Sequence, residues 1–277
     1  MHELDRILDA IRRTERGVVV TVIRTEGSTY RRMGARAVIG QDGRAVGAIS
    51  GGCLERDLAE RIAPWLEEMT PRIVTYDSTR SSDIVFGLGL GCRGILDLLI
   101  EPFDARQPPP LASFRWNGRE PVRWTTTLPN GETLVELIAP QRALVVFGGG
   151  ADVEPVLALA KQLGWQTDLV TTREAIEVDH YDAAVIMTHN FMRDVDVLRM
   201  LLASPIAYIG ILGPKQRGSE LLAELAHPGD PRIHNPIGLD LGGETPEEIA
   251  LSIIAEIQAV LNRRGAGSLR ERQGAIH

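Results

Sequence analysis

The chain has 277 residues, of which 44% are hydrophobic and 24% are charged, so it is long enough for two domains with buried cores. Its formal net charge of −7 argues against general nucleic-acid binding and against docking on an acidic membrane, both of which favour a basic surface. Two cysteines exclude a disulfide framework, no apolar run reaches transmembrane length, and the charged first residues do not resemble a secretory signal, so we expect a soluble cytoplasmic protein.

The first hundred residues alternate between helical and strand patterns. Residues 3–16 carry apolar side chains at helical spacing, and Gly17 is a common type of helix terminator. Asp42-Gly43 is a strong signal for a hairpin turn between two strands. The pattern therefore predicts a mixed α/β N-terminal domain over residues 1–103. Its expected elements are a helix at 3–16, a helix from Leu54 to Met69, and strands at 18–23, 35–39, 44–49, 72–76 and 95–100.

The middle of the chain is harder to assign. Residues 104–110 (DARQPPP) are rich in proline, which is typical of a domain boundary. Short strands are expected around Phe114 and Trp124, and residues 129–131 (PNG) favour a turn. Residues 104–141 are therefore either a linker or a hairpin that extends the first domain, and the sequence leaves both possibilities open.

Residues 142–277 alternate between short apolar strands and helices. This alternation predicts a Rossmann-like C-terminal domain with a doubly wound parallel sheet. Thr245, Pro246 and Glu248 form a strong start signal for the last long helix. The other expected elements are strands at 143–147, 166–170, 183–187 and 206–209, and helices at 153–163, 195–202 and 215–225.

Cys53 lies on a glycine turn, directly before the second predicted helix. Gly51 and Gly52 would let the backbone approach a ligand closely. The first turn of a helix offers N–H groups without helical partners and a partial positive charge, which favour a thiolate that can act as a nucleophile or metal ligand. A cysteine at this position can also be a small buried hydrophobic residue, and the sequence leaves both interpretations open.

The second cysteine, Cys92, lies in an equally glycine-rich run, residues 87–94 (GLGLGCRG). Arg93 next to it would favour the thiolate. Two cysteines are too few for a structural zinc site, which needs four donors. Together with Arg31 and Arg32 of the polar 25–34 loop, Cys53 and Cys92 could form a cationic pocket that bears thiols and suits an anionic, sulfur-rich ligand.

The turn from Gly148 to Gly150 follows a predicted strand and precedes a helix, which is the context of a phosphate-binding turn. Val153 occupies the place of the third glycine in the dinucleotide-binding pattern, and Asp152 puts negative charge near the expected anion. An acidic residue that would hold a ribose after the second strand is also missing. The turn therefore favours the fold strongly and NAD(P) binding only weakly.

Further polar residues follow the third and fourth predicted strands of this domain. His189 could be a ligand, a proton carrier or a cap of the loop. Lys215 and Arg217 could hold an anion at the same edge of the sheet, or they could belong to a solvated helix start. In an open parallel sheet, ligands bind at the carboxyl ends of the strands, which is where all three residues are expected.

Several motifs in order along the chain resemble the XdhC/CoxI family, whose members mature molybdenum hydroxylases such as xanthine dehydrogenase. The resemblance covers most of the chain, and its most specific motif is residues 50–55 (SGGCLE). The other motifs are residues 27–35 (GSTYRRMGA), 89–94 (GLGCRG), 146–150 (VFGGG), 208–214 (YIGILGP), 236–240 (PIGLD) and 245–250 (TPEEIA). One departure is that many members have a histidine soon after the Rossmann glycines, where this chain has residues 151–153 (ADV).

The resemblance implies a chaperone without turnover chemistry of its own. Such a protein binds molybdenum cofactor, protects it while its terminal ligand is exchanged for sulfur, and delivers it to the client enzyme. Cys53, followed by Cys92, would then contact the cofactor through its metal, and the implied partners are the large subunit of a molybdenum hydroxylase and a cysteine desulfurase. A homodimer through the apolar C-terminal helix stays open. The alternatives are an NAD(P)-dependent oxidoreductase and a scaffold that holds no cofactor.

Overall fold

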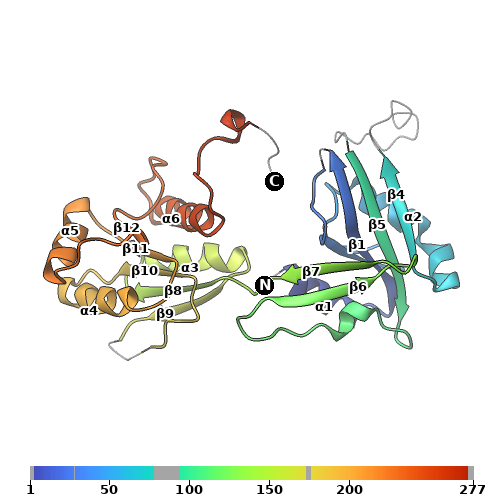
Figure 1. The fold of residues 1–277 in the computed structure, drawn as a ribbon, viewed down its shortest axis with the longest axis horizontal. Coiled ribbons are helices and arrows are strands. Elements are labelled where there is room, and N and C mark those ends of the chain that lie inside the picture. The colour runs from blue at the N-terminus through green and yellow to red at the C-terminus, as the bar shows by residue number, and fades with distance from the viewer. Residues whose placement is uncertain (1–2, 28, 78–93, 173–175, 274–277) are drawn as a thin grey trace. The chain divides into compact units, whose positions relative to one another are not determined.

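The computed structural model describes residues 3–27, 29–77, 94–172 and 176–273. Within them the chain forms two compact units, residues 3–140 and residues 141–272 (Figure 1). Each unit has its own sheets and its own hydrophobic cores. The mixed α/β fold with a Rossmann-like C-terminal domain is confirmed.

The N-terminal unit is built on a five-stranded antiparallel sheet with the strand order β3-β2-β1-β5-β4. The long strand β1 lies at its centre and pairs with β5 over most of its length. The elements are α1 (Glu3–Arg13), β1 (Arg16–Gly27), β2 (Arg36–Gly40), β3 (Ala45–Gly47), α2 (Cys53–Glu68), β4 (Arg72–Asp77), β5 (Gly94–Asp104), the 3₁₀ helix η2 (Pro110–Ser113), β6 (Val122–Thr127) and β7 (Thr133–Ile138).

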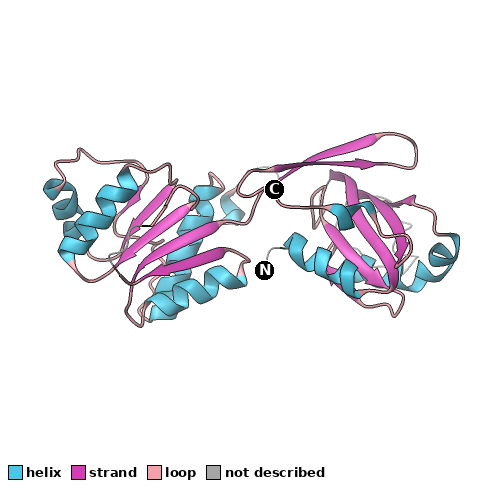
Figure 2. Cartoon of the chain, turned by 90° about the horizontal axis from the view of Figure 1, so that it is seen from below, coloured by secondary structure: helices cyan, strands magenta, loops and turns pink. Residues whose placement is uncertain are grey.

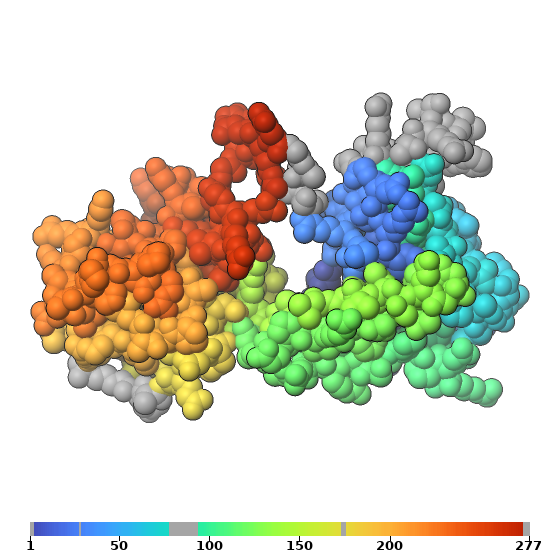
Figure 3. All heavy atoms as spheres, viewed as in Figure 1, coloured from blue at the N-terminus to red at the C-terminus, as the bar shows by residue number. Residues whose placement is uncertain are grey.

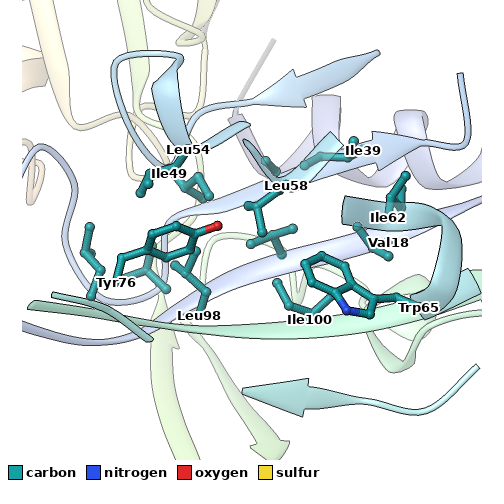
Figure 4. Packing of buried hydrophobic residues seen from close by; sticks show 14 of the residues in the cluster. Val18, Ile39, Ile49, Leu54, Leu58, Ile62, Trp65, Tyr76, Leu98 and Ile100 are labelled. Carbon is teal, nitrogen blue, oxygen red and sulfur yellow. The ribbon is translucent and has the colours of Figure 1, made fainter. Parts of the chain in front are cut away.

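Two hydrophobic cores cover opposite faces of this sheet. On one face, Leu54, Leu58 and Ile62 of α2 pack with strand residues such as Val18 and Leu98 (Figure 4). On the other face, α1 packs with the strand residues of opposite parity, because successive side chains of a strand point to opposite sides. The apolar stripe of each helix therefore decides which side of the sheet the helix covers.

The predicted hairpin at Asp42-Gly43 is confirmed, since β2 and β3 pair in antiparallel register. β3 is shorter than the predicted 44–49 strand. It ends at Gly47, whose φ of 91° is left-handed and whose Cα lies so close to β2 that a Cβ would collide with the Arg36 carbonyl oxygen. The chain therefore leaves the sheet at Gly47 and reaches the start of α2 through residues 48–52.

Strand β5 extends beyond the predicted 95–100 to Asp104. Pro102 lies opposite Val18 of β1, while β4 begins only at Arg72, opposite Ile100. Pro102 thus lies where β5 has a single neighbouring strand, which is a position that tolerates a residue without a backbone N–H.

Residues 104–138 contain the 3₁₀ helix η2 and the β6–β7 hairpin. The hairpin around Trp124 is present, but the strand predicted around Phe114 is wrong. Pro110 begins the 3₁₀ helix, and Phe114 follows it as a buried anchor with ring contacts to Trp116 at 5.0 Å and Trp124 at 5.5 Å. The hairpin residues Val122, Trp124 and Ile138 extend the core beneath α1.

The C-terminal unit contains a five-stranded parallel sheet with the order β9-β8-β10-β11-β12. Its elements are β8 (Ala143–Gly148), α3 (Val153–Gln162), β9 (Gln166–Val170), β10 (Ala183–Met187), α4 (Phe191–Leu202), β11 (Tyr208–Ile211), α5 (Lys215–Glu224), β12 (Ile233–His234), α6 (Pro246–Leu261) and the 3₁₀ helix η3 (Leu269–Glu271). The doubly wound parallel sheet is confirmed, and β12 was not predicted because it has only two residues.

Helices cover both faces of the parallel sheet (Figure 2). Helices α3 and α6 pack on one face with Leu144 and Val146, while α4 and α5 pack on the other with Val145 and Phe147. All residues of β8, β10 and β11 are buried, as expected for strands with helices on both sides. The predicted capping box of Thr245 and Glu248 is present at the start of α6. Within the described ranges, no helix is long and apolar enough to span a membrane.

Candidate functional site

Cys53 is the first residue of α2 and the single cysteine in the part of the chain that the structure describes. Its side chain is half-buried and packs against the edge of the α2 core. Gly52 caps the helix with φ 107° and ψ −16°, a left-handed conformation that would strain an L residue with a side chain. A Cβ on Gly51 or Gly52 would meet no atom within 4 Å, so the turn beside the thiol is open.

Ser50 and Glu55 hold this turn in place by hydrogen bonds to its backbone. The Ser50 hydroxyl oxygen accepts hydrogen bonds from the N–H of Gly52 at 3.0 Å and of Leu54 at 3.2 Å, and it donates to the Glu55 carboxylate. It lies 3.7 Å from the Cys53 sulfur. Ser50 therefore occupies N–H groups at the start of α2 and fixes the position from which Cys53 projects.

The Glu55 carboxylate is buried and closes the same ring of contacts. One of its oxygens accepts the N–H groups of Ile49 and Ser50, each at 2.8 Å. Burial alone would raise the pKa of Glu55, but the hydrogen bonds from the Ser50 hydroxyl and the backbone outweigh it and lower the pKa below its ordinary value. Glu55 is thus a charged acceptor that ties the 49–50 backbone to the first turn of α2.

Arg31 and Arg32 line a pocket of the N-terminal unit. This pocket of about 440 Å³ also includes Glu3 of α1 and Glu136 of β7, and Cys53 is not among its lining residues. The shared pocket of these arginines with Cys53 and Cys92 therefore stays a prediction, since Cys92 lies outside the described residues. In the space-filling view, the green β6–β7 hairpin lies alongside blue residues of the same unit (Figure 3). Residues 30–36 supply another wall of this pocket.

The second cysteine run lies outside the described residues. This applies to Cys92, to Arg93 and to the glycines at 87–91, so the structure tests none of their expected roles. Among the residues that are described, no group of three or more histidine, cysteine, aspartate or glutamate side chains could hold a metal ion.

The turn after β8 brings Gly148, Gly150 and His189 to one edge of the parallel sheet. The strand order changes direction between β8 and β10, so this edge is the usual ligand position of the fold. The His189 ring nitrogen Nε2 lies 3.0 Å from the Asp152 carboxylate, and His189 has a left-handed φ of 56°. A Cβ on Gly148 would lie 2.7 Å from the carbonyl oxygen of Met187.

Acidic and paired groups occupy this edge. A Cβ on Gly150 would collide with the Asp152 carboxylate, which stands where a dinucleotide's pyrophosphate would approach the start of α3. Arg217, which the sequence offered as an anion ligand, donates to the buried Asp194 at 2.6 Å and 3.1 Å. Its charge is therefore already compensated within the protein.

Models of known protein families match both units of the chain. The XdhC and CoxI family model matches residues 10–77, and the model of the XdhC Rossmann domain matches residues 144–257. The chain belongs to the XdhC and CoxI family. The predicted membership is confirmed, and the Gly148 turn and the His189 loop lie within the XdhC Rossmann domain.

Similar proteins match almost the whole chain. A Bacillus subtilis (strain 168) protein named as a probable xanthine dehydrogenase subunit is 27% identical over 93% of this chain and 97% of its own length. The Escherichia coli (strain K12) molybdenum cofactor insertion chaperone PaoD is 25% identical over 91% of this chain and 86% of its own length. A crystal structure from Bacillus halodurans, described as a xanthine dehydrogenase, has a TM-score of 0.79 at 28% identity and covers 97% of this chain and 98% of that one.

Two residues that hold the cysteine turn, Ser50 and Glu55, were not predicted from the sequence. Ser50 and Glu55 stand at the two ends of the SGGCLE motif, and their contact follows from the turn that Gly52 allows. A capping box with the acidic residue three positions after the serine is a known signal, but here the separation is five positions. One signal was present in the sequence: Glu55 lies on the buried face of the predicted helix. A buried carboxylate needs a hydrogen-bond partner close by, and Ser50 is near in the sequence.

Proposed function

We propose that this protein carries molybdenum cofactor as cargo, supports the exchange of its terminal ligand for sulfur, and delivers it to a molybdenum hydroxylase such as xanthine dehydrogenase. Membership in the XdhC and CoxI family supports this function. So does a relative named molybdenum cofactor insertion chaperone that matches 91% of the chain. The names of two other similar proteins include xanthine dehydrogenase, the kind of enzyme that would be the client.

The observation that carries the proposal is the placement of Cys53. Its side chain is half-buried at the N-terminus of a sixteen-residue helix, beside a turn with open space over Gly51 and Gly52. A cysteine sulfur is a soft ligand that binds metals readily. In this proposal Cys53 is the residue that contacts the cargo through its metal, and Cys92 is a second candidate.

Ser50 and Glu55 are positioning residues in this proposal. Ser50 lies between the Cys53 sulfur and the buried Glu55 carboxylate, and both residues bond the backbone on either side of the turn. A sulfur atom fixed in this way does not have to be ordered when the cargo arrives, so less conformational entropy is lost on binding. The glycines leave room for a large planar cargo to approach the thiol.

The test is to purify the full chain from a host that makes molybdenum cofactor and to assay bound pterin by fluorescence after oxidation. We expect pterin with the wild type, little or none with Cys53→Ala, and about tenfold less with Ser50→Ala. Ser113→Ala, an exposed serine of the same unit, is the matched control and should retain wild-type loading. Absence of pterin from the wild type, or equal pterin in Cys53→Ala, would contradict the proposal.

The second candidate is an NAD(P)-dependent oxidoreductase, which the Rossmann domain and the dehydrogenase names of two relatives favour. Against it stand the Asp152 carboxylate over Gly150 and the buried Val153 in place of the third glycine. Titration calorimetry with NAD(H) and NADP(H) separates the two functions. For a carrier we expect no heat of binding at millimolar nucleotide. A saturable binding signal would favour the oxidoreductase.

The proposed partners are the large subunit of the client and a cysteine desulfurase. A scaffold that binds these partners without holding cofactor is distinguished from a carrier by pull-downs with Cys53→Ala. A pure scaffold keeps its partners and contains no pterin even as the wild type. A carrier contains pterin as the wild type and loses it in the variant.

A further inference from the structure

The pocket around Arg31 and Arg32, about 440 Å³ in volume, is assembled from three distant segments. They are the start of α1, residues 30–36 and the end of β7. The Arg36 guanidinium and the Glu136 carboxylate form a buried ion pair in its wall, although the two residues are a hundred positions apart. Gly34 makes this approach possible, since a Cβ there would collide with the Glu136 carboxylate.

Apolar side chains surround the mouth of this pocket. Tyr30 is 56% exposed, Met33 52% and Leu137 72%, and all three line the pocket. The interior side is formed by Leu4 and Ile7 of α1. Large exposed apolar residues that gather around one cavity mark a binding site, and the volume falls in the usual range for small-molecule pockets, about 300–1,000 Å³.

The charges of the pocket leave one cation available. Arg31 is bound to the Glu3 carboxylate by contacts of 2.7 Å and 2.8 Å, and Arg36 is bound to Glu136. Arg32 is exposed and forms no ion pair with any residue in the described ranges. A planar guanidinium without a protein partner is well suited to a phosphate, which it can contact through two N–H groups.

We propose that this pocket binds a planar heterocycle that carries a phosphate, and that its ligand is the pterin-phosphate end of the cargo. The ring lies against Tyr30 and Met33, and the phosphate is bound by Arg32. Aromatic and thioether side chains pack favourably on a flat ring, and the cation supplies the specificity for the phosphate. This inference rests on the proposed carrier function. Cys53 does not line this pocket, so the metal of the same cargo molecule would extend beyond the pocket to reach the thiol.

The probe for this site is the fluorescent, metal-free pterin that oxidation of molybdenum cofactor yields, either with its phosphate or after phosphatase treatment. Binding to the full chain is measured by fluorescence anisotropy. We expect the phosphorylated probe to bind about tenfold or more tightly than the dephosphorylated one. Arg32→Ala should weaken the phosphorylated probe to the level of the dephosphorylated one, while Tyr30→Ala weakens both and Tyr30→Phe neither.

Arg44→Ala is the matched control, because Arg44 is an exposed cation of the same unit that does not line this pocket. It should bind both probes like the wild type. Both Tyr30 and Arg32 are exposed, so their variants should fold, and circular dichroism checks this. No binding of the phosphorylated probe, or equal binding by Arg32→Ala and the wild type, would overturn the proposal.

Two further outcomes distinguish a pterin site from a nucleotide site and from the metal contact of Cys53. CMP and GMP also combine a heterocycle with a phosphate, and displacement of the probe by either nucleotide at lower concentration than by the unlabelled pterin would overturn the pterin assignment. The probe contains no molybdenum, so its binding does not depend on the thiol. Probe binding without any cofactor recovered from cells would uphold the pocket and contradict the carrier function, and the reverse pattern would contradict the pocket alone.

Discussion

The two units each contain a glycine turn that leads from the sheet into a helix, and the two turns differ in the free space around their glycines. At Gly51 and Gly52 an added Cβ would meet nothing within 4 Å. At Gly148 it would lie 2.7 Å from a backbone oxygen, and at Gly150 it would collide with Asp152. Gly51 and Gly52 leave open space beside a thiol, whereas Gly148 allows close packing against β10 and Gly150 lies beside the Asp152 carboxylate.

The contrast extends to the charge at each helix start. The carboxylate of Glu55 is turned inward, where backbone N–H groups and Ser50 hold it, so the start of α2 stays open to an incoming ligand. The carboxylate of Asp152 instead stands beside the Gly150 backbone and His189. A glycine-rich turn before a helix therefore does not by itself indicate a ligand site, and the position of the nearest carboxylate distinguishes the two cases.

The largest effect is expected from Glu55→Ala. This change leaves the N–H groups of Ile49 and Ser50 buried without their acceptor, which should lower the free energy of unfolding by about 2–4 kcal/mol. Urea unfolding followed by tryptophan fluorescence measures it, because three of the four tryptophans, Trp65, Trp116 and Trp124, belong to the N-terminal unit. Glu55→Gln keeps an acceptor oxygen and should lose less. Equal stability of Glu55→Ala and the wild type would show that the inward carboxylate does not hold the turn.

Alanine should act on stability at one glycine turn and on cargo loading at the other. Gly148→Ala forces a Cβ against the carbonyl oxygen of Met187 and should destabilise the C-terminal unit by about 1–3 kcal/mol. Gly51→Ala should change the unfolding free energy by less than about 0.5 kcal/mol, because its Cβ has free space. Gly51→Ala should nevertheless reduce pterin loading, since the methyl group enters the space beside Cys53. Full loading of Gly51→Ala would indicate that the cargo does not approach over this turn.

Acid should weaken the Cys53 turn through Glu55. Burial raises the pKa of this carboxyl, but its hydrogen bonds lower the pKa by a larger amount. The folded-state pKa therefore lies below the ordinary value of 4.5. The carboxylate therefore stabilises the fold above about pH 4.5, and this contribution is lost as the pH falls through the folded-state pKa. The difference in unfolding free energy between the wild type and Glu55→Gln should shrink between pH 7 and pH 4. A constant difference would rule out this linkage.

The smallest effect is expected at the other turn, from Asp152→Asn. The pair of Asp152 and His189 is exposed on the histidine side, and such surface pairs contribute about 0–1 kcal/mol. Pterin loading of this variant should equal that of the wild type. A loss of cargo as large as that of Cys53→Ala would place the binding site in the Rossmann domain instead.

Local patterns predicted most of the fold because the elements depend on local physics. The apolar spacing of residues 3–16, the Asp42-Gly43 turn and the capping box of Thr245 and Glu248 each appear in the structure as expected. The failure at Phe114 has a local cause too, since Pro110 starts a 3₁₀ helix where an aromatic residue suggested a strand. Strand β5 continues beyond Ile100 because Pro102 pairs with β1 alone and no strand on its other side needs its missing N–H. Which strands flank Pro102 depends on the strand order of the whole sheet, so local sequence does not predict it.

The candidate site was predictable only in part. Cys53 and its two glycines follow from composition and spacing, and the structure places them at a helix start as expected. The ion pair between Arg36 and Glu136 spans a hundred residues and joins a strand to a hairpin that the sequence could not orient. The pocket around Arg32 therefore could not be derived from local patterns, because its walls meet only through tertiary packing.

X-ray absorption at the molybdenum edge shows whether the Cys53 sulfur contacts the metal of the cargo. Wild-type protein and Cys53→Ser are loaded with the same cofactor in vitro, at concentrations where both retain metal. We expect the wild-type spectrum to show one more sulfur neighbour of molybdenum than the spectrum of the variant. Identical sulfur shells in the two spectra would contradict it.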